Sequence, residues 1–264
     1  MFTARRIDVA ASCVALILAA LPTARPASAA PDTAAEQIAR GDQLYAQAKL
    51  GEARDAYQAA LKAAPNHFVA LYRLAQVESE LGEDAKGEER ARLVAAAVEH
   101  ARAAVSAAPE SAQGHVWLAA TLGRQALKEG PKKRLALSRE IKAEADRALQ
   151  IDPTLARAYH VRAIWNRKVA SLSVIERMAA NAVLGGVPKG ASMENAVRDL
   201  EKAVELEPSY VNHQLELGRT FMMLKRMAEA RRELEKAAGL PPTSNPRDPI
   251  YQAEARDLLK RLPR

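Results

Sequence analysis

The sequence predicts an all-α protein built from repeated helix pairs. Only 4% of its 264 residues are aromatic, and alanine supplies much of the 48% that are hydrophobic, which favours helices over sheets. Five prolines each follow a stretch in which apolar residues recur at helical spacing: Pro65, Pro109, Pro153, Pro208 and Pro242. Successive prolines of this set lie 44, 44, 55 and 34 residues apart. Because proline ends a helix, this regular punctuation predicts a stacked helical repeat.

The first and last repeat units carry the pattern of tetratricopeptide repeats. In the first unit the matching residues are Gly41, Leu44, Ala53, Tyr57, Ala60 and Pro65. In the last unit they are Leu217, Gly218, Phe221, Ala230, Leu234, Ala237 and Pro242. Glycine and alanine at these positions let the two helices of a hairpin approach closely, and the larger residues fill the seam.

The middle units fit the same pattern with insertions. The second contains a charged loop at 82–90, the third breaks at Gly130-Pro131, and the fourth is about twenty residues longer than a standard unit. A last helix, 248–262, would shield the final apolar face. We therefore predict a right-handed superhelical stack of about five hairpins and a capping helix within residues 30–264. The expected repeats are 34–66, 68–110, 112–154, 156–209 and 211–242.

Residues in and after the fourth unit indicate which family of repeat proteins the chain resembles. They are Ala163, Trp165, Val169, Leu172-Ser173, Glu176, Gly185-Gly186, Pro188, Ser192 and Ala196, followed by Leu217-Gly218, Glu229-Ala230 and Leu240-Pro241. This set resembles the tetratricopeptide domain of the regulator of microtubule dynamics family, including its bacterial relatives, over roughly residues 110 to 262. The resemblance implies a non-enzymatic helical-repeat protein, and in animal relatives the domain is associated with membrane contact and phospholipid binding. The chain departs from the family at four positions, where charged side chains replace more apolar or neutral ones and so affect any lipid specificity: Arg157, His160, Arg167 and Lys168.

Residues 1–29 predict a cleaved signal peptide. Arg5-Arg6 gives a basic start, Val9 to Leu21 is an apolar run, and Ala27-Ser28-Ala29 offers the small residues needed for cleavage. The run is too short to span a bilayer stably, so we expect a periplasmic or secreted protein with no transmembrane span after cleavage. The one cysteine, Cys13, lies inside the run, the wrong place for a lipoprotein cysteine, which leaves lipid anchoring a minor alternative. A microtubule role does not follow for an exported chain.

The sequence offers no constellation of catalytic or metal-binding residues. The histidines lie one or two to a repeat, without His-Glu-x-x-His spacing: His67, His100, His115, His160 and His213. Segment 185–190 lacks the Gly-Lys-Ser/Thr of a phosphate loop, and Ser192 after it is expected to cap a helix. There is no Gly-x-Ser-x-Gly elbow either. We predict a protein that is not an enzyme and needs no cofactor or metal.

A binding groove is expected on the first helices of the hairpins, which line the concave face of such a stack. The candidate groove residues on the fourth and fifth units are Arg157, His160, Arg167, Lys168, Asn212, Arg219 and Met222. Guanidinium groups can hold a carboxylate or phosphate with two hydrogen bonds, so a basic stripe beside apolar residues suits an anionic ligand with an apolar body. Ordinary solvated helix charges remain the alternative explanation of this stripe.

Two binding hypotheses follow. The first is a periplasmic scaffold that holds a protein or peptide partner, acidic in character, in the concave groove. The second is a module for phospholipid or another anionic lipid, suggested by the family resemblance and by the long apolar insert from Val169 to Val187. An enclosed apolar cavity near the insert would favour the lipid, and a solid core would count against it. The net charge of +7 agrees with either anionic partner, and export makes nucleic acid a poor one.

Overall fold

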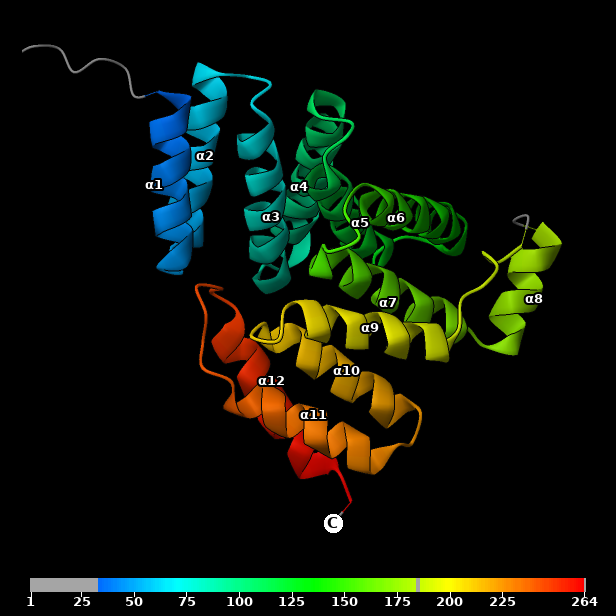
Figure 1. Cartoon of the computed structure of the whole chain (residues 1–264). Helices are drawn as coiled ribbons and strands as arrows, with labels where there is room; N and C mark the ends of the chain where they lie inside the picture. The colour runs from blue at the N-terminus through cyan, green and yellow to red at the C-terminus, as the bar shows by residue number, and fades with distance from the viewer. Residues whose placement is uncertain (1–32, 184–185, 264) are drawn as a thin grey trace, which may run out of the picture. The chain divides into compact units, whose positions relative to one another are not determined.

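The computed structural model describes residues 33–183 and 186–263, and every regular element in these ranges is a helix (Figure 1). The predicted signal peptide, 1–29, lies outside the described residues. The helices belong to one compact unit, Asp32–Arg264. None of them is long and apolar enough to cross a membrane.

The described helices form five hairpins and two additional elements. The hairpins pair α1 (Ala34–Ala46) with α2 (Leu50–Ala63), α3 (Phe68–Asp84) with α4 (Gly87–Ala107), α5 (Ala112–Ala126) with α6 (Pro131–Ile151), α7 (Ala156–Ala170) with α9 (Met193–Leu206), and α10 (Val211–Met223) with α11 (Met227–Gly239). The additional helices are α8 (Val174–Val183) and α12 (Asp248–Arg261). Successive hairpins pack on one another, so the all-α prediction of a superhelical stack of helical repeats is confirmed for the described part of the chain.

Glycine sets the close approach within the first and last hairpins. A Cβ atom on Gly41 would run into the ring of Tyr57 on α2, and one on Gly218 would lie 2.7 Å from Cγ of Leu234 on α11. Both positions therefore need a residue without a side chain. Ala53 and Ala230 on the facing helices are fully buried, which agrees with the role that the repeat pattern assigns to alanine.

Local sequence signals fix where the helices begin. Thr33 and Glu36 form a reciprocal capping box at the start of α1. Pro131 occupies the first turn of α6, where its missing N–H costs no hydrogen bond. Ser192 caps α9 as expected, because its side chain accepts a hydrogen bond of 3.0 Å from the backbone N–H of Asn195.

The long insertion of the fourth unit contains a separate helix, α8. It packs on α6, whereas the helix before it, α7, pairs with the helix after it, α9 (Figure 1). Arg139 on α6 ties down the segment that follows α8 by donating a hydrogen bond of 2.8 Å to the carbonyl of Gly186. The insertion therefore adds a wall beside the hairpins without interrupting their stacking.

The start of α12 meets the end of α3, far away in the sequence. Arg247 at the N-cap of α12 is buried and ion-pairs with Glu83 at 2.7 Å and with Asp84 at 3.0 Å. Its guanidinium also lies 5.9 Å from the centre of the Tyr251 ring. The capping helix thus covers the last hairpin and also contacts the second one.

Candidate ligand pocket

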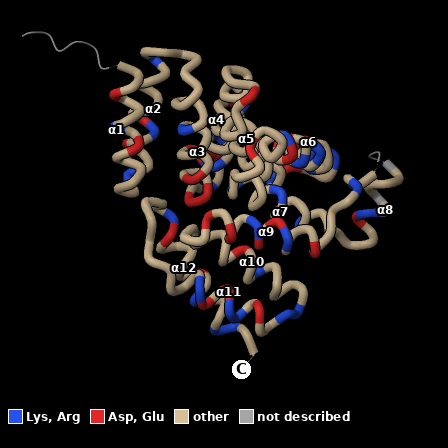
Figure 2. The backbone as a smooth tube through the Cα atoms, viewed as in Figure 1, with Lys and Arg blue, Asp and Glu red and all other residues tan. Residues whose placement is uncertain are grey.

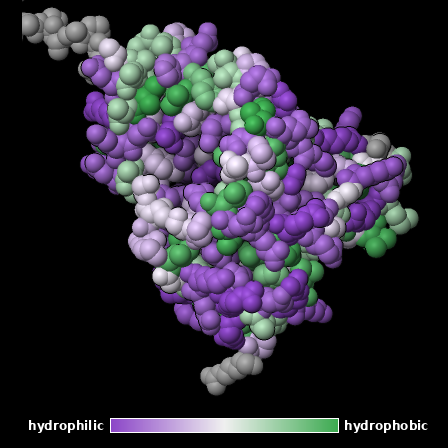
Figure 3. Space-filling view, in the orientation of Figure 1, coloured by the Kyte–Doolittle hydropathy of each residue, from purple (hydrophilic) through white to green (hydrophobic). Residues whose placement is uncertain are grey.

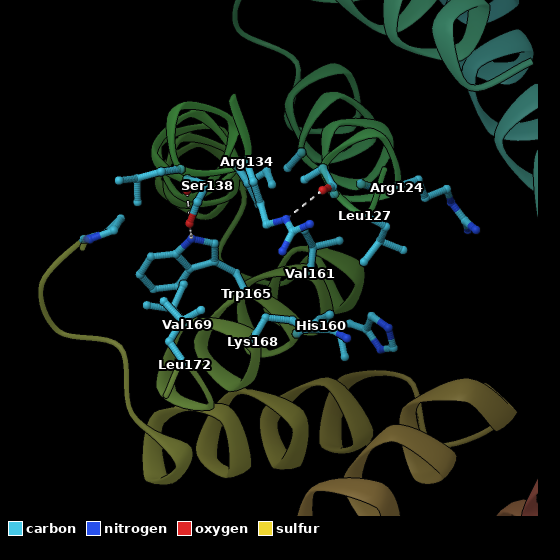
Figure 4. Close-up of a pocket in the computed structure, with 18 of the residues that line it drawn as sticks. Arg124, Leu127, Arg134, Ser138, His160, Val161, Trp165, Lys168, Val169 and Leu172 are labelled. Carbon is cyan, nitrogen blue, oxygen red and sulfur yellow. Dashed lines mark hydrogen bonds between the residues drawn. The ribbon is translucent and has the colours of Figure 1, made fainter. Parts of the chain in front are cut away.

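Helices α5, α6, α7 and α8, with the loop leading into α9, surround an apolar pocket of about 520 Å³ (Figure 4). Its walls are mainly aliphatic, and they include Leu127, Leu135, Val161, Ile164, Val169, Leu172 and Val187. On α7, Val161, Trp165 and Val169 line the pocket at four-residue steps and Ile164 lies three residues after Val161, so they form one stripe along that helix. A pocket of this size and character can enclose most of a small apolar ligand.

Trp165 forms the wall between α6 and α7. Its indole N–H donates to the carbonyl of Ser138 at 2.8 Å, and the side chain is 5% exposed (Figure 4). Because its polar atom is satisfied by α6, the ring can present only apolar surface to the pocket. Trp165 thereby anchors α7 to α6.

Cationic side chains stand at the rim of the pocket. Lys168 is exposed and makes no ion pair with any described residue. Arg134 turns back to donate hydrogen bonds to the carbonyls of Ala126 at 3.3 Å and Glu129 at 2.9 Å. Figure 4 shows Lys168 on α7 across the pocket from Arg134. Lys168 is therefore the rim cation that is available to pair with an anionic group.

The inner end of the pocket is polar. The guanidinium of Arg157 lies 4.7 Å from the ring centre of Trp117 and 5.2 Å from that of Tyr210. Glu80 faces the same space and accepts a hydrogen bond of 2.8 Å from the Tyr45 hydroxyl. Burial raises the pKa of the Glu80 carboxyl, although the Tyr45 hydroxyl and Arg124 favour its ionised form.

Two histidines meet beside Arg157. The Nδ1 atoms of His160 on α7 and His213 on α10 are 2.9 Å apart, so one ring must donate and the other accept. Burial lowers the pKa of His160 well below 6.5, and His213 and Arg157 lower it further. Burial also lowers the pKa of His213, against the opposing effect of Glu207 at 3.4 Å. Burial thus favours the neutral form of both rings, and their contact joins the first helices of the fourth and fifth units.

The seven predicted groove residues divide into two groups. Four of them line the pocket: Arg157, His160, Lys168 and Asn212. The other three serve packing between helices. Arg167 is buried and ion-pairs with Glu216, Arg219 pairs with Glu216 and Glu254, and Met222 packs against the core of the last two hairpins.

A second, polar cavity of about 420 Å³ adjoins the first. Trp117 and Arg157 line both, and the remaining walls include Tyr72, Arg73, Gln76, Gln113 and Glu207. Amide and aromatic side chains on first helices suit the backbone and side chains of an extended peptide. Residues of the first helices of several hairpins thus line one apolar and one polar cavity.

Several pocket residues could not be identified from sequence spacing. Leu127 and Leu135 flank the Gly130-Pro131 break, and Val187 follows α8. Only the fold brings these segments to the α7 stripe. The long apolar insert was the one usable signal, since it marked this region as larger than a packed repeat requires. No group of three or more His, Cys, Asp or Glu residues in the described ranges could hold a metal ion.

Comparison with known proteins identifies the family. Residues 37–263 match the family described as Regulator of microtubule dynamics protein 1-3. The chain belongs to this family. The match begins at residue 37, well before residue 110, where the resemblance was expected to start, so the first two hairpins share the family pattern as well.

Individual relatives agree with this assignment. The regulator of microtubule dynamics protein 1 of Mus musculus is 30% identical over 231 residues, which are 86% of this chain and 74% of that protein. Protein 3 of Rattus norvegicus is 30% identical over 190 residues, 71% of this chain and 40% of that protein. The chain therefore spans less than half of the rat protein.

Solved structures show the same fold. A thermophilic TPR protein of Thermus thermophilus has a TM-score of 0.63 at 21% identity, with 84% of this chain and 98% of that chain covered. PilW, a type IV pilus biogenesis factor, has a TM-score of 0.54 at 18% identity, with 86% and 90% covered. These likenesses show that the chain has the fold of a helical-repeat protein.

Proposed function

We propose that the chain is an exported, non-enzymatic binding protein whose apolar pocket takes the hydrocarbon chain of an anionic amphiphile, such as a fatty acid or a phospholipid. Export is proposed from the signal pattern of residues 1–29, which favours a periplasmic or secreted location. The family and the fold point to a helical-repeat protein without enzymatic activity. The relatives are named for microtubule dynamics, and we do not extend that role to an exported chain.

The apolar pocket with a free cation at its rim carries this proposal. Each CH₂ group that moves from water into such a pocket contributes about 0.8 kcal/mol of favourable binding free energy. Lys168 can then pair with the anionic group at the end of the chain, and Arg157 offers a second cation at the inner end. The apolar insert of the fourth unit thus lines part of an apolar pocket, which supports the lipid hypothesis.

Native mass spectrometry tests the proposal. The protein is secreted by its own host, purified without detergent and sprayed intact. We expect a bound species with the mass of a fatty acid or phospholipid. After delipidation, a fluorescent fatty acid should bind again. A clean apo mass together with no rebinding would contradict the proposal.

Two substitutions locate the binding site. Ile164→Trp fills the pocket and should abolish rebinding of the fluorescent fatty acid. Lys168→Glu should weaken rebinding by about tenfold, because it replaces an attractive charge with a repulsive one. Lys62→Glu on α2 is the matched control, since Lys62 is likewise exposed and unpaired among the described residues. Equal affinities of the two lysine variants would place the ligand elsewhere.

A protein or peptide partner is the second candidate function, and the polar cavity favours it. Tyr72 on α3 and Gln113 and Trp117 on α5 can supply hydrogen bonds and stacking to an extended segment. A photo-reactive side chain in place of Gln113 should cross-link this partner in the host. The same side chain in place of the exposed Gln150 on α6 should not. Equal cross-linking at both positions would argue against a groove-bound partner.

A further inference from the structure

Large exposed hydrophobic side chains gather at the end of the molecule that carries α8. Val174 is 72% exposed, Ile175 79% and Met178 66%, and these positions share one face of the helix. Leu127, 55% exposed, lines the same pocket as Ile175. Figure 3 shows hydrophobic surface at the tip of α8. A cluster of this kind on an otherwise polar surface marks an interaction site.

The placement of α8 does not account for these side chains. Among the described helices, α8 packs only on α6, and Ala180 is the buried residue among those α8 residues whose burial the structure describes. Ser173 and Glu176 cap the helix and stabilise its first turn, so the helix is well formed at the end where Val174 and Ile175 point to solvent. The apolar face of α8 is thus held outward by a capped helix.

The surface around this face is basic. Lys128, Lys132 and Lys189 flank residues that line the same pocket, are exposed, and make no ion pair with any described residue. Lys133 pairs with Glu129 at 2.6 Å, which neutralises that acid. The other acid, Glu176, is engaged by Ser173 and lies in the field of Arg134. Figure 2 shows Lys and Arg at the α6 end that faces α8.

We propose that α8 and the start of α6 form a docking surface for an anionic lipid bilayer. Val174, Ile175 and Met178 enter the boundary between headgroups and acyl chains, and Lys128, Lys132 and Lys189 lie at the level of the phosphates. An outward apolar helix face bordered by lysines is the arrangement that favours binding at a membrane interface. The charge complementarity selects an anionic bilayer over a neutral one.

This surface is independent of what the pocket holds. Val174 and Met178 do not line the pocket, so their replacement leaves its walls intact. Docking can therefore succeed where amphiphile binding fails, and the reverse. Ile175 and Ala180 of α8 line the pocket, so a docked molecule would hold this wall of the pocket close to the bilayer.

Vesicle sedimentation tests the apolar part of the surface. Wild-type protein should sediment with vesicles of phosphatidylglycerol and phosphatidylcholine, and much less with pure phosphatidylcholine. The double variant Val174→Glu with Met178→Glu should bind the anionic vesicles about tenfold more weakly. The matched control is Met223→Glu with Ile250→Glu, which changes two exposed apolar residues on other helices by the same charge. Absence of wild-type binding, or equal binding of the two double variants, would overturn the proposal and assign the α8 face to a protein partner.

A charge-reversal pair tests the electrostatic part. Lys128→Glu with Lys132→Glu should reduce binding to the anionic vesicles by about tenfold or more. Lys62→Glu with Lys86→Glu has the same net charge at exposed lysines far from α8 in the sequence and should bind as the wild type does. Equal loss in both pairs would show that net charge alone attracts the protein, which would overturn the assigned surface.

A fluorescence measurement covers the case in which a variant folds poorly. In a Cys13→Ser background, Met178→Cys provides a single thiol for an environment-sensitive dye. We expect a blue shift of its emission when the anionic vesicles are added, and none for Ile250→Cys labelled in the same way. An unshifted dye at residue 178 on vesicle-bound protein would overturn the insertion of α8.

Discussion

The guanidinium of Arg247 ion-pairs with the carboxylate of Asp84 at 3.0 Å and so joins the start of α12 to the end of α3. Arg247 is 6% exposed, whereas Asp84 is largely exposed, and Glu83 adds a second contact at 2.7 Å. The arginine therefore gives up most of its hydration for these partners. This contact holds the start of the capping helix against the second hairpin.

Arg247→Ala should destabilise the protein by about 2 kcal/mol, because it removes charge-assisted hydrogen bonds from a buried position. Chemical denaturation measures the loss, and amide exchange in α12 should become faster. Arg256→Ala on the same helix is the control, because Arg256 is exposed and has no ion pair with a described residue. If both variants unfolded alike, the contact with α3 would contribute nothing.

Gly218→Ala should destabilise the protein by about 1–3 kcal/mol. The added methyl group would lie 2.7 Å from Cγ of Leu234, which is fully buried and has no room to move. Gly51→Ala on α2 is the opposite case, because nothing lies within 4 Å of the new Cβ atom. It should leave stability unchanged or raise it slightly. Thermal unfolding compares the two, and equal midpoints would contradict the close approach of α10 and α11.

These glycines illustrate which parts of the fold the sequence could predict. Hairpins form from contacts between neighbouring segments, so Gly41, Gly218 and the prolines after each unit carry most of the information locally. The separate helix α8 was not predicted, because the insertion matches no repeat position. The sequence indicated a cavity beside the insert only as a condition for lipid binding and did not identify its walls, since Leu127, Val161 and Val187 come together only through tertiary packing.

Stability should fall as the pH decreases below about 6.5, because of His160 and His213. Burial lowers the pKa of both rings in the folded protein, so the unfolded chain takes up protons first and gains stability relative to the fold. The slope is at most about 1.4 kcal/mol per pH unit for each proton. Arg157 and Arg167 repel a positive charge on His160. On His213, Glu207 favours the charged ring and so works against the effect of burial.

The double variant His160→Gln with His213→Gln should show a flatter dependence between about pH 6.5 and 5. Denaturant unfolding at several pH values measures it, with His67→Gln as the control. His100 acts in the opposite direction, because Glu78 outweighs burial and raises its pKa, so its contribution is present at low pH and lost as the pH rises. It is common to all variants and cancels in the comparison. An unchanged slope in the double variant would contradict the role of the pair.

Arg167 and Lys168 are neighbours in the sequence with different roles in the structure. Successive residues on a helix point about 100° apart, so Lys168 faces the pocket rim while Arg167 turns toward α10. There Arg167 donates to the carbonyl of Glu216 at 3.1 Å and to Thr220 Oγ1 at 3.0 Å, besides pairing with the Glu216 carboxylate. Sequence spacing placed both residues on one basic stripe. The pattern within one repeat could not separate them, because Glu216, the partner of Arg167, lies on another repeat.

Substitution should separate the two roles. Arg167→Ala leaves Glu216 buried beside one remaining cation, Arg219, and should cost about 3 kcal/mol of stability. Lys168→Ala should change stability by less than about 0.5 kcal/mol, because it removes only an exposed, unpaired charge. Urea unfolding measures both, and fatty-acid rebinding at a temperature where both variants are folded measures the ligand. The expected pattern is a loss of stability for Arg167→Ala and a loss of affinity for Lys168→Ala. The reverse pattern would mean that Arg167, and not Lys168, faces the ligand.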